Sequence, residues 1–472
     1  MAPSTGLSLG GPVRKGLLGI HVLGEGFGES IVITFPSGAV GVVDCFARRL
    51  KVGGHEDRIK ANPTLRFLRQ TLKAERLAFV ALTHPHEDHG RGLSHLLCDY
   101  QGAIDEIWLF AGFETIDLGR YLAAAVSRKR QLPIEQLLDD PPGTFANEMM
   151  KIREIVDEEL STKGGGTARY RLFQGTKRVK ITGEPLITIR FIGPADGMAH
   201  AYISEMTDGV RQIVQDDGAV APDWEPTAIN HNRISPSLML EFGDTRILLG
   251  GDMETEAWAE VEREIDQQES ELRGLECHLV KVSHHGSATG FTPTLYQRMV
   301  FRGEKPLAIL TCFNRNKHPL PSPEGVAHLM SATRLLATNA AMAASSGMSR
   351  AWASMPDRWF RDIQDDPQLA GLLRPELVRG EVPRPTKRAL PEKWLADIRT
   401  RPELVAVLTE EVVRRCAQPI PSELDVLAAH RVSIYFDDAG KEADRFVGSG
   451  AGELIRTRPG PVESVTQGEK IQ

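Results

Sequence analysis

Short apolar runs that end in polar residues recur along the first part of the chain, and they predict buried strands. These runs cover residues 17–23, 30–35, 39–46, 77–83 and 104–110. The segment "PSG" at 36–38 predicts a hairpin turn between the second and the third run. Residues 63–75 carry apolar side chains at helical spacing, and "GLSHLLCDY" predicts a further helix that begins close to His89.

The same alternation continues to about residue 338. Further strands are predicted at 185–194, at 278–283, at 306–313 and in a hairpin over 235–252 that turns at Gly243 and Asp244. A helix is predicted at 254–268, between the hairpin and the next strand. The pattern predicts an α/β fold whose polar motifs follow strand ends, where such scaffolds usually display their chemistry.

Two stretches interrupt this predicted core, which we expect to span residues 1–338. Residues from about 114 to 180 turn polar and helical, and "STKGGGTARY" within them is typical of a flexible link. Residues 339–430 predict a second helical insertion, rich in Arg, Pro and Glu. Strand character returns at 431–456, which we expect to complete the core, and a disordered tail is predicted for 457–472.

The second insertion contains a weak internal duplication. The segment "PDRWFRDIQDDPQLAGLL" (356–373) matches "PEKWLADIRTRPELVAVL" (391–408), with Trp359 aligned to Trp394. Two copies are too few for a free-standing solenoid. The duplication indicates either a helical hairpin packed on the core or a surface that binds a protein partner.

Composition narrows the class of protein. The formal net charge of -7 argues against a polybasic nucleic-acid coat, so a nucleic-acid substrate would need a local basic patch. The sequence has no apolar run of about 18 residues and no apolar signal core at its start, which predicts a cytoplasmic protein without membrane contact. The cysteines are scattered and more typical of small buried side chains than of metal ligands or disulfides: Cys45, Cys98, Cys277, Cys312 and Cys416.

The segment "HPHEDH" (84–89) places metal-binding side chains directly after a predicted strand. His84 and His86 are two residues apart, and such side chains point the same way in extended backbone, so both imidazoles can bind one metal ion. Asp88 and His89 follow at the start of a predicted helix and can reach a neighbouring ion. Because this pattern arises by chance in on the order of one chain in a thousand of this size, we interpret it as a metal site rather than a solvated loop.

One loop cannot complete the coordination of two ions, and two other strand ends offer ligands. The segment "RILLGGD" leads directly into Asp252, which can bridge two ions or cap the following helix. The segment "LVKVSHHGS" delivers His284 and His285 at another strand end, and we choose His284 as the ligand because it follows the strand more directly. The predicted metal ligands are His84, His86, Asp88, His89, Asp252 and His284.

In this order the motifs resemble those of the metallo-β-lactamase superfamily, and the chain looks most like the lactamase-like domain of the ComEC/Rec2 competence proteins and their stand-alone relatives. "GEGFGESIVITFPSG" and "GVVDCF" are similar to that family's opening strands, with Asp44 at its first motif, and "THPHEDHGRG" resembles its second motif. "PSLMLEFGDTRILLGGDM", "VKVSHHGS" and "NRNKHPLPSPE" resemble three later motifs, the last with His318 at its histidine. The resemblance covers about residues 17–338 and the final strands, with gaps at the two insertions.

The resemblance implies a four-layer αββα sandwich with helical insertions, in which two mixed sheets pack face to face. It also implies two divalent metal ions with Asp252 as the bridging carboxylate. Zinc is the first candidate for the metal, and manganese is the second. The superfamily often has a third histidine on the first ion, and the alternatives for that position here are His231, His200, Asn232 and water. The transmembrane portion of ComEC-like proteins is absent, so the resemblance does not imply DNA uptake.

The function that we expect is metal-dependent hydrolysis of a phosphodiester, in a nucleic acid or a nucleotide, by a metal-bound hydroxide. Asp88 would orient that hydroxide, and His285 or His318 would donate a hydrogen bond to the substrate or the leaving group. Candidate phosphate ligands are Arg91, Arg315 and Lys317. One alternative is hydrolysis of a small ester, thioester or lactam, and another is a metal-binding sensor or partner subunit of a multiprotein system, such as a defence system, that docks through the helical insertion.

Overall fold

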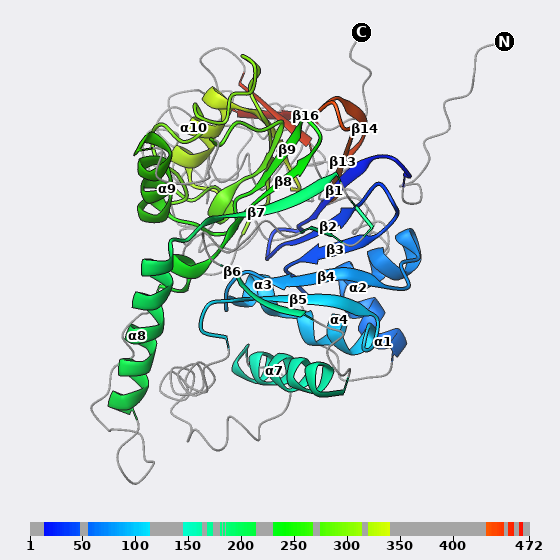
Figure 1. Cartoon of the computed structure of the whole chain (residues 1–472). Helices are drawn as coiled ribbons and strands as arrows, with labels where there is room; N and C mark the ends of the chain where they lie inside the picture. The colour runs from blue at the N-terminus through cyan, green and yellow to red at the C-terminus, as the bar shows by residue number, and fades with distance from the viewer. Residues whose placement is uncertain are drawn as a thin grey trace, which may run out of the picture.

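Two β-sheets pack face to face, and helices cover their outer sides (Figure 1). The computed structural model describes residues 14–47, 55–113, 145–162, 168–172, 180–181, 183–184, 186–213, 230–267, 274–313, 320–339, 431–447, 452–456 and 462–465. The predicted insertion at 339–430, with its Trp359 and Trp394, therefore lies almost wholly outside the described residues, as does the part of the first insertion at 114–144.

The first sheet has the strand order β14-β13-β1-β2-β3-β4-β5-β6. Its strands are β1 (Leu18–Leu23), β2 (Ser30–Thr34), β3 (Val40–Val43), β4 (Leu77–Leu82), β5 (Ile104–Phe110), β6 (Ala168–Leu172), β13 (Arg431–Phe436) and β14 (Glu442–Val447). The pairs from β3 to β6 are parallel, and the other pairs are antiparallel. Because β13 pairs with β1, the chain returns to its first sheet after it has built most of the second.

The second sheet has the strand order β16-β15-β12-β11-β10-β9-β8-β7. Its strands are β7 (Ile187–Gly193), β8 (Ser237–Phe242), β9 (Thr245–Leu249), β10 (Leu279–Lys281), β11 (Leu307–Leu310), β12 (Arg334–Ala337), β15 (Gly452–Arg456) and β16 (Val462–Val465). Here too the central pairs, from β9 to β12, are parallel and the outer pairs are antiparallel. Each sheet therefore contains a run of parallel strands whose carboxyl ends can display functional groups.

Helical segments connect and cover these strands. They are α1 (His55–Ala61), α2 (Pro63–Arg66), η1 (Phe67–Leu72), α3 (Glu87–Gly90), α4 (Leu93–Asp99), α7 (Phe145–Thr162), α8 (Asp196–Ile213), η2 (His231–Ile234), α9 (Thr255–Gln267), η3 (Ser283–Gly286) and α10 (Pro323–Ala332). Helix α2 begins where Pro63 fixes the first turn and the Asn62 side chain accepts hydrogen bonds from the amides of Thr64 and Leu65. Helix α8 extends away from the body of the molecule at the lower left of Figure 1.

Three groups of buried apolar side chains hold the layers together. The first packs α2, η1, α4 and α7 against the outer face of the first sheet, and the third packs α9 and α10 against the outer face of the second. The second group lies between the sheets and joins strands β1 to β5 with strands β7 to β12. The order helix, sheet, sheet, helix confirms the predicted αββα four-layer sandwich.

Some elements differ from the sequence prediction. Helix α8 falls in a stretch for which no helix is predicted, because its buried positions Ala199, Tyr202 and Met206 form only a narrow apolar stripe among polar residues. Strand β6 occupies the end of the predicted flexible link, and β16 lies within the predicted disordered tail. Both are short strands stabilised by pairing with a neighbour, β5 or β15, which local sequence does not reveal.

Trp108 lies at the centre of the core between the sheets. Its ring stacks on Phe79 at a centroid distance of 3.9 Å, and it meets Phe191 of the opposite sheet edge-on at 5.9 Å. Trp108→Ala is expected to lower the free energy of unfolding by about 3–5 kcal/mol, because it removes a large buried ring and leaves a cavity. Urea denaturation measures this effect, with Leu186→Ala as the control, because Leu186 is 60% exposed and should change stability by no more than about 0.5 kcal/mol. Equal unfolding midpoints for the two variants would contradict the expectation.

None of the helices in the described parts of the chain is long and apolar enough to cross a membrane.

Candidate metal centre

The loop after β4 brings three histidines together. Its backbone turns tightly, with the amide of His86 donating to the carbonyl of His84 (3.0 Å) and the amide of His89 donating to the carbonyl of His86 (3.1 Å). As a result the ring of His84 lies 4.6 Å from the ring of His86 and 4.3 Å from that of His89, centroid to centroid. The predicted convergence of these side chains after the strand is therefore what the structure shows.

Asp252 approaches the histidine loop from the second sheet. Strand β9 ends at Leu249, and the chain then turns through Gly251, whose φ is +54°. A Cβ atom at Gly251 would lie 2.5 Å from the carbonyl oxygen of Pro236, so only glycine fits this close approach. The turn leaves the Asp252 carboxylate 3.3 Å from Nε2 of His89 and 3.8 Å from Nε2 of His84.

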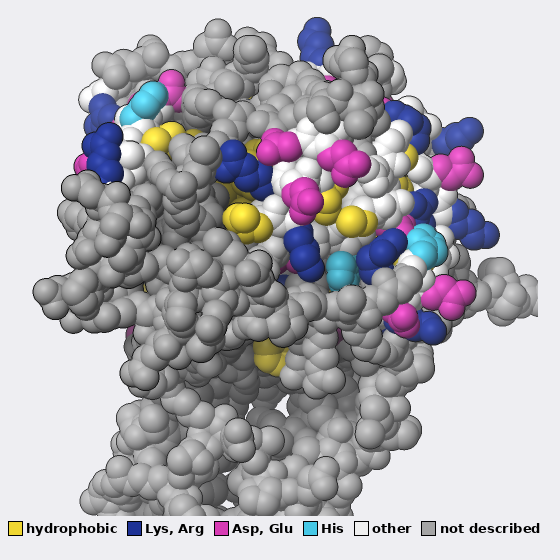
Figure 2. Space-filling view, turned by 90° about the horizontal axis from the view of Figure 1, so that it is seen from below, with side chains coloured by type: hydrophobic (Ala, Val, Ile, Leu, Met, Phe, Trp, Pro, Cys, Tyr) yellow, Lys and Arg dark blue, Asp and Glu magenta, His cyan; other side chains and the backbone are white. Residues whose placement is uncertain are grey.

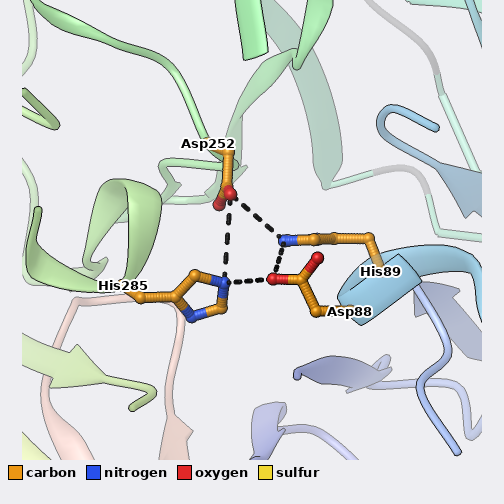
Figure 3. Close-up of side chains that lie close together, drawn as sticks. All are labelled: Asp88, His89, Asp252 and His285. Carbon is orange, nitrogen blue, oxygen red and sulfur yellow. Dashed lines mark hydrogen bonds and ion pairs between the residues drawn. The ribbon is translucent and has the colours of Figure 1, made fainter. Parts of the chain in front are cut away.

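His285 reaches the same place from the end of β10. The chain leaves extended geometry in η3, where His284 and His285 have φ values of 45° and 50°. In this conformation Nε2 of His285 lies 3.1 Å from Oδ2 of Asp88 and 3.9 Å from Oδ2 of Asp252. Figure 3 shows the four side chains of Asp88, His89, Asp252 and His285 pointing toward one another from the two halves of the molecule.

Besides a group of Glu29, Asp44 and His89, the donor atoms of the described residues form two adjoining groups, and within each group every donor atom lies within 4.8 Å of the others. One group is His84, His86 and Asp252, and the other is Asp88, His89, Asp252 and His285. All of these side chains are buried except that of His86, which is partly exposed. Asp252 belongs to both groups, as a bridging carboxylate would.

Unpartnered atoms at the centre test whether a metal ion fits this set. Nε2 of His89 and Oδ1 of Asp252 are buried, and neither has a hydrogen-bond partner among the described residues. Burying a polar atom without a partner costs free energy, and burying carboxylates without a compensating charge costs more. Imidazole nitrogens and carboxylate oxygens are the ligands that zinc prefers, so the residues present fit a divalent ion.

The pKa shifts of two histidines also indicate that the centre favours positive charge. Burial lowers the pKa of His84 well below its usual value, which keeps that imidazole neutral and able to bind a metal. The pKa of His89 is instead raised well above its usual value, because the attraction of Asp252, Asp44 and Asp88 outweighs the effect of burial. The three carboxylates thus hold a proton at a position where a metal ion can take its place.

Asp44 fixes the orientation of two of the imidazoles from behind. Its carboxylate accepts hydrogen bonds from the amide and the hydroxyl of Thr83, both at 2.8 Å, and lies 2.7 Å from Nδ1 of His89. Because the Thr83 hydroxyl donates to Asp44, its oxygen accepts from Nδ1 of His84 at 2.9 Å. His84 therefore carries its proton on Nδ1 and directs the lone pair of Nε2 to the centre, while Nδ1 of His89 donates to Asp44 and leaves Nε2 as the ring nitrogen that a metal ion can bind. The sequence placed Asp44 at a family motif but assigned it no role, and Thr83 was not singled out.

His284 does not enter either donor group. Its side chain is 19% exposed, its Nδ1 lies 3.3 Å from Oε1 of Glu254, and its Nε2 lies 3.2 Å from the amide nitrogen of Asn232. Thr289 also contacts both His284 and Glu254. The geometry thus brings His285, rather than His284, to the carboxylates of the centre, and a metal-ligand role for His284 stays a prediction.

The candidates for a third ligand of the first ion differ in how close they lie to the predicted ligands. The ring of His231 meets that of His86 at 5.4 Å, and its Nδ1 lies 2.8 Å from the hydroxyl of Tyr202. Asn232 is its neighbour in η2, and Oδ1 of Asn232 is buried without a hydrogen-bond partner in the part of the chain that the structure describes. His200 is exposed on α8, where Nδ1 contacts the Asp196 carbonyl. Of these, His231 and Asn232 are the two that the structure places beside the predicted ligands.

The remaining predicted site residues are His318 and the three candidate phosphate ligands. His318, Arg315 and Lys317 lie outside the described residues, so their roles stay predictions. Arg91, the third candidate phosphate ligand, forms a hydrogen-bonded ion pair with Glu87 at 2.6 Å.

Comparison with known proteins adds a likeness at the level of solved structures. No protein-family model matches the chain, and no curated protein matches it. The chain is similar to the metallo-β-lactamase fold protein YhfI from Bacillus subtilis, with 12% identity, coverage of 67% of this chain and 93% of that one, and a TM-score of 0.31. It is also similar to Zn(2+)-bound PqqB from Methylobacterium extorquens, with 10% identity, coverage of 55% and 71%, and a TM-score of 0.23. Because these values are low, the fold assignment rests on the strand order and the layers themselves.

Proposed function

We propose that the chain is a metal-dependent hydrolase that cleaves phosphodiester bonds at a dinuclear site. The observation that carries this proposal is the position of Asp252, whose carboxylate is shared by the two donor groups. Two groups that share one carboxylate suit two divalent ions a few ångströms apart, the arrangement found in many phosphoester hydrolases. The donor set favours zinc, with manganese as the second candidate.

Most residues of the centre would bind the metal ions, and one of them would also orient the attacking water. When bound, a pair of divalent ions activates water and polarises the phosphoryl oxygens of a substrate. His84 and His86 would hold one ion and His89 and His285 the other, with Asp252 between them. Asp88 has acceptor capacity beyond one ligand bond, so it would also orient the attacking water.

His284 would meet the substrate rather than an ion. It is partly exposed, and contacts with Glu254 and Asn232 hold its ring at the edge of the centre. A hydrogen bond from this ring to a substrate oxygen would stabilise negative charge that develops in the transition state. His318 stays a second candidate for this role, as the sequence predicts.

The choice of a phosphodiester rests on the resemblance of the motifs to ComEC-like domains and on Arg315 and Lys317, which flank His318 closely in the sequence. Nucleic acids and nucleotides are the substrates that this choice implies. Membership of a ComEC-like branch is part of the same proposal. A protein partner bound through residues 339–430 stays a prediction as well, because that insertion lies outside the described residues.

A small ester, thioester or lactam is the second candidate substrate. It is favoured by the pairing of nearby arginine side chains with acidic ones. Arg91 is paired with Glu87, and Arg233 lies 3.3 Å from Glu205. On the described part of the face in Figure 2, basic and acidic side chains are interspersed and form no basic track. A nucleic-acid backbone is usually held by such a track, whereas a small ester does not need one.

A panel of substrates with the metal-loaded protein distinguishes these candidates. The panel contains bis(p-nitrophenyl) phosphate, single- and double-stranded DNA, p-nitrophenyl acetate, a thioester and a chromogenic lactam, each with zinc and with manganese. We expect turnover of the phosphodiesters, inhibition by chelators, and weaker binding of DNA as salt rises. Turnover of the ester, thioester or lactam without any phosphodiester cleavage would contradict the proposal and support the second candidate.

A further inference from the structure

Glu29 is a buried carboxylate directly behind the candidate metal centre. It follows the glycine-rich turn after β1, its side chain is 1% exposed, and its amide donates to the carbonyl oxygen of Asp88 at 3.0 Å. A Cβ atom on the preceding Gly28 would lie 2.5 Å from that same oxygen, so the two loops press against each other. The position of Glu29 is therefore fixed relative to the histidine loop.

Lys281 forms an ion pair with Glu29 inside the protein. It is the last residue of β10 and is fully buried, and no other lysine is buried among the described residues. A buried ion pair costs desolvation energy that its own attraction often fails to offset, so its presence is poor evidence for a role in stability alone. The residues that contact this ion pair indicate a different role for it.

The Thr311 hydroxyl connects this ion pair to His285. Its oxygen lies 2.5 Å from Oε2 of Glu29 and 3.0 Å from Nδ1 of His285. A carboxylate can only accept, so Thr311 donates its proton to Glu29, and its oxygen must accept from Nδ1–H of His285. With Nδ1 engaged by Thr311, Nε2 is the ring nitrogen left for a metal ion, and it is the atom that faces Asp88 and Asp252.

The same arrangement of a carboxylate, a threonine hydroxyl and a histidine occurs on the other side of the centre, without a lysine. There the Thr83 hydroxyl donates a hydrogen bond to Asp44 and accepts one from Nδ1 of His84. The Asp44 carboxylate also accepts hydrogen bonds from the Thr83 amide and from Nδ1 of His89. Asp44 is thus surrounded by hydrogen-bond donors, whereas Oε1 of Glu29 has no hydrogen-bond partner in the described protein. At Glu29 the positive charge of Lys281 takes the place of the missing donors.

We infer that Glu29 and Lys281 form a positioning pair that acts through the Thr311 hydroxyl to hold His285 in the tautomer and orientation of a metal ligand. This inference rests on the proposed metal site and deepens it. The pair acts on His285 in one donor group, whereas Asp44 orients His89 in that group and, through Thr83, His84 in the other.

Thr311→Val tests the connection most directly, because it removes the hydroxyl and keeps the shape of the side chain. We expect the affinity for one of the two ions to fall about 10- to 100-fold, the usual range for residues that orient metal ligands, while the other ion binds as in the wild type. Thr311→Ser should restore binding, since it returns the hydroxyl. Stepwise titration with cobalt(II), followed by its visible absorption and by competition with a chelator, measures each ion separately.

The ion pair needs a different variant, because Lys281→Met alone would leave Glu29 charged and unpaired and could unfold the protein. The double variant Glu29→Gln with Lys281→Met removes both charges and should fold. We expect it to show the same selective loss of one ion.

The matched control is Thr292→Val. Thr292 is also buried and also donates to a carboxylate, Oε2 of Glu262 at 2.6 Å, which is itself paired with Arg298, but this cluster contacts no histidine of the centre. We expect it to leave both metal affinities unchanged. If the wild type binds two ions and neither Thr311→Val nor the double variant weakens either of them, the inference is overturned while the proposed function stands. If the wild type binds no divalent ion, both are overturned.

Discussion

Asp252→Asn is expected to remove nearly all bound metal from the purified protein. The Asp252 carboxylate belongs to both donor groups and lies 3.3 Å from His89 and 3.8 Å from His84, so its charge serves both ions. Hydrolytic turnover should fall roughly 10²- to 10⁴-fold, which corresponds to several kcal/mol of lost transition-state stabilisation. Elemental analysis of the protein after dialysis, together with the substrate panel, measures both effects.

Two further variants make this result specific. His86→Ala removes a ligand from one group alone, so this variant should retain one ion where Asp252→Asn retains almost none. Asp266→Asn is the control for loss of a carboxylate, since Asp266 is a mostly exposed residue of α9 paired with Arg298. Full metal content in Asp252→Asn would exclude a bridging role for this residue.

His285→Ala and His284→Ala are expected to separate metal binding from substrate binding. His285→Ala should lose one ion, because Nε2 of His285 lies against the carboxylates of Asp88 and Asp252. His284→Ala should keep both ions and lose on the order of 10²-fold in turnover, within the range for a group that stabilises developing charge. Metal content and turnover of the two variants, measured side by side, distinguish these roles.

The opposite result has an equally clear meaning. If His284→Ala loses metal and His285→Ala does not, then His284 is the ligand that the sequence predicts, and η3 must rearrange when metal binds. If neither variant changes metal content, the strand end after β10 is not part of the metal site at all.

The choice between these adjacent histidines shows what sequence could not decide. His84 and His86 are predictable because they directly follow a strand and belong to a compact motif of metal-binding side chains. After β10 the chain instead enters a turn with positive φ at both His284 and His285, so strand alternation no longer says which ring faces the centre. The sequence therefore locates the site at this strand end but not the residue.

Contacts between distant segments were also beyond prediction. The hydroxyl of Thr311 meets Glu29 across 282 residues of sequence, and His285 meets Asp88 across 197. A lysine in an apolar strand, such as Lys281, gives a weak local signal, because a single charged residue is normally found at a surface. The α/β class was easier to predict, because short apolar runs followed by polar motifs recur at each parallel strand, whereas the four layers were implied by the resemblance of the motifs to a known family.

Because Asp88 and His89 follow a strand of the first sheet and Asp252 and His285 follow strands of the second, metal ions bound as proposed would join the two sheets. The binding free energy would then count toward the docking of the two halves as well as toward catalysis. At an ion concentration 100 times the dissociation constant, one such site adds about 2.7 kcal/mol to the stability of the folded chain. Metal supply would thereby set the lifetime of this protein in the cell as well as its activity, since a chain that lacks ions would open more often and be degraded sooner.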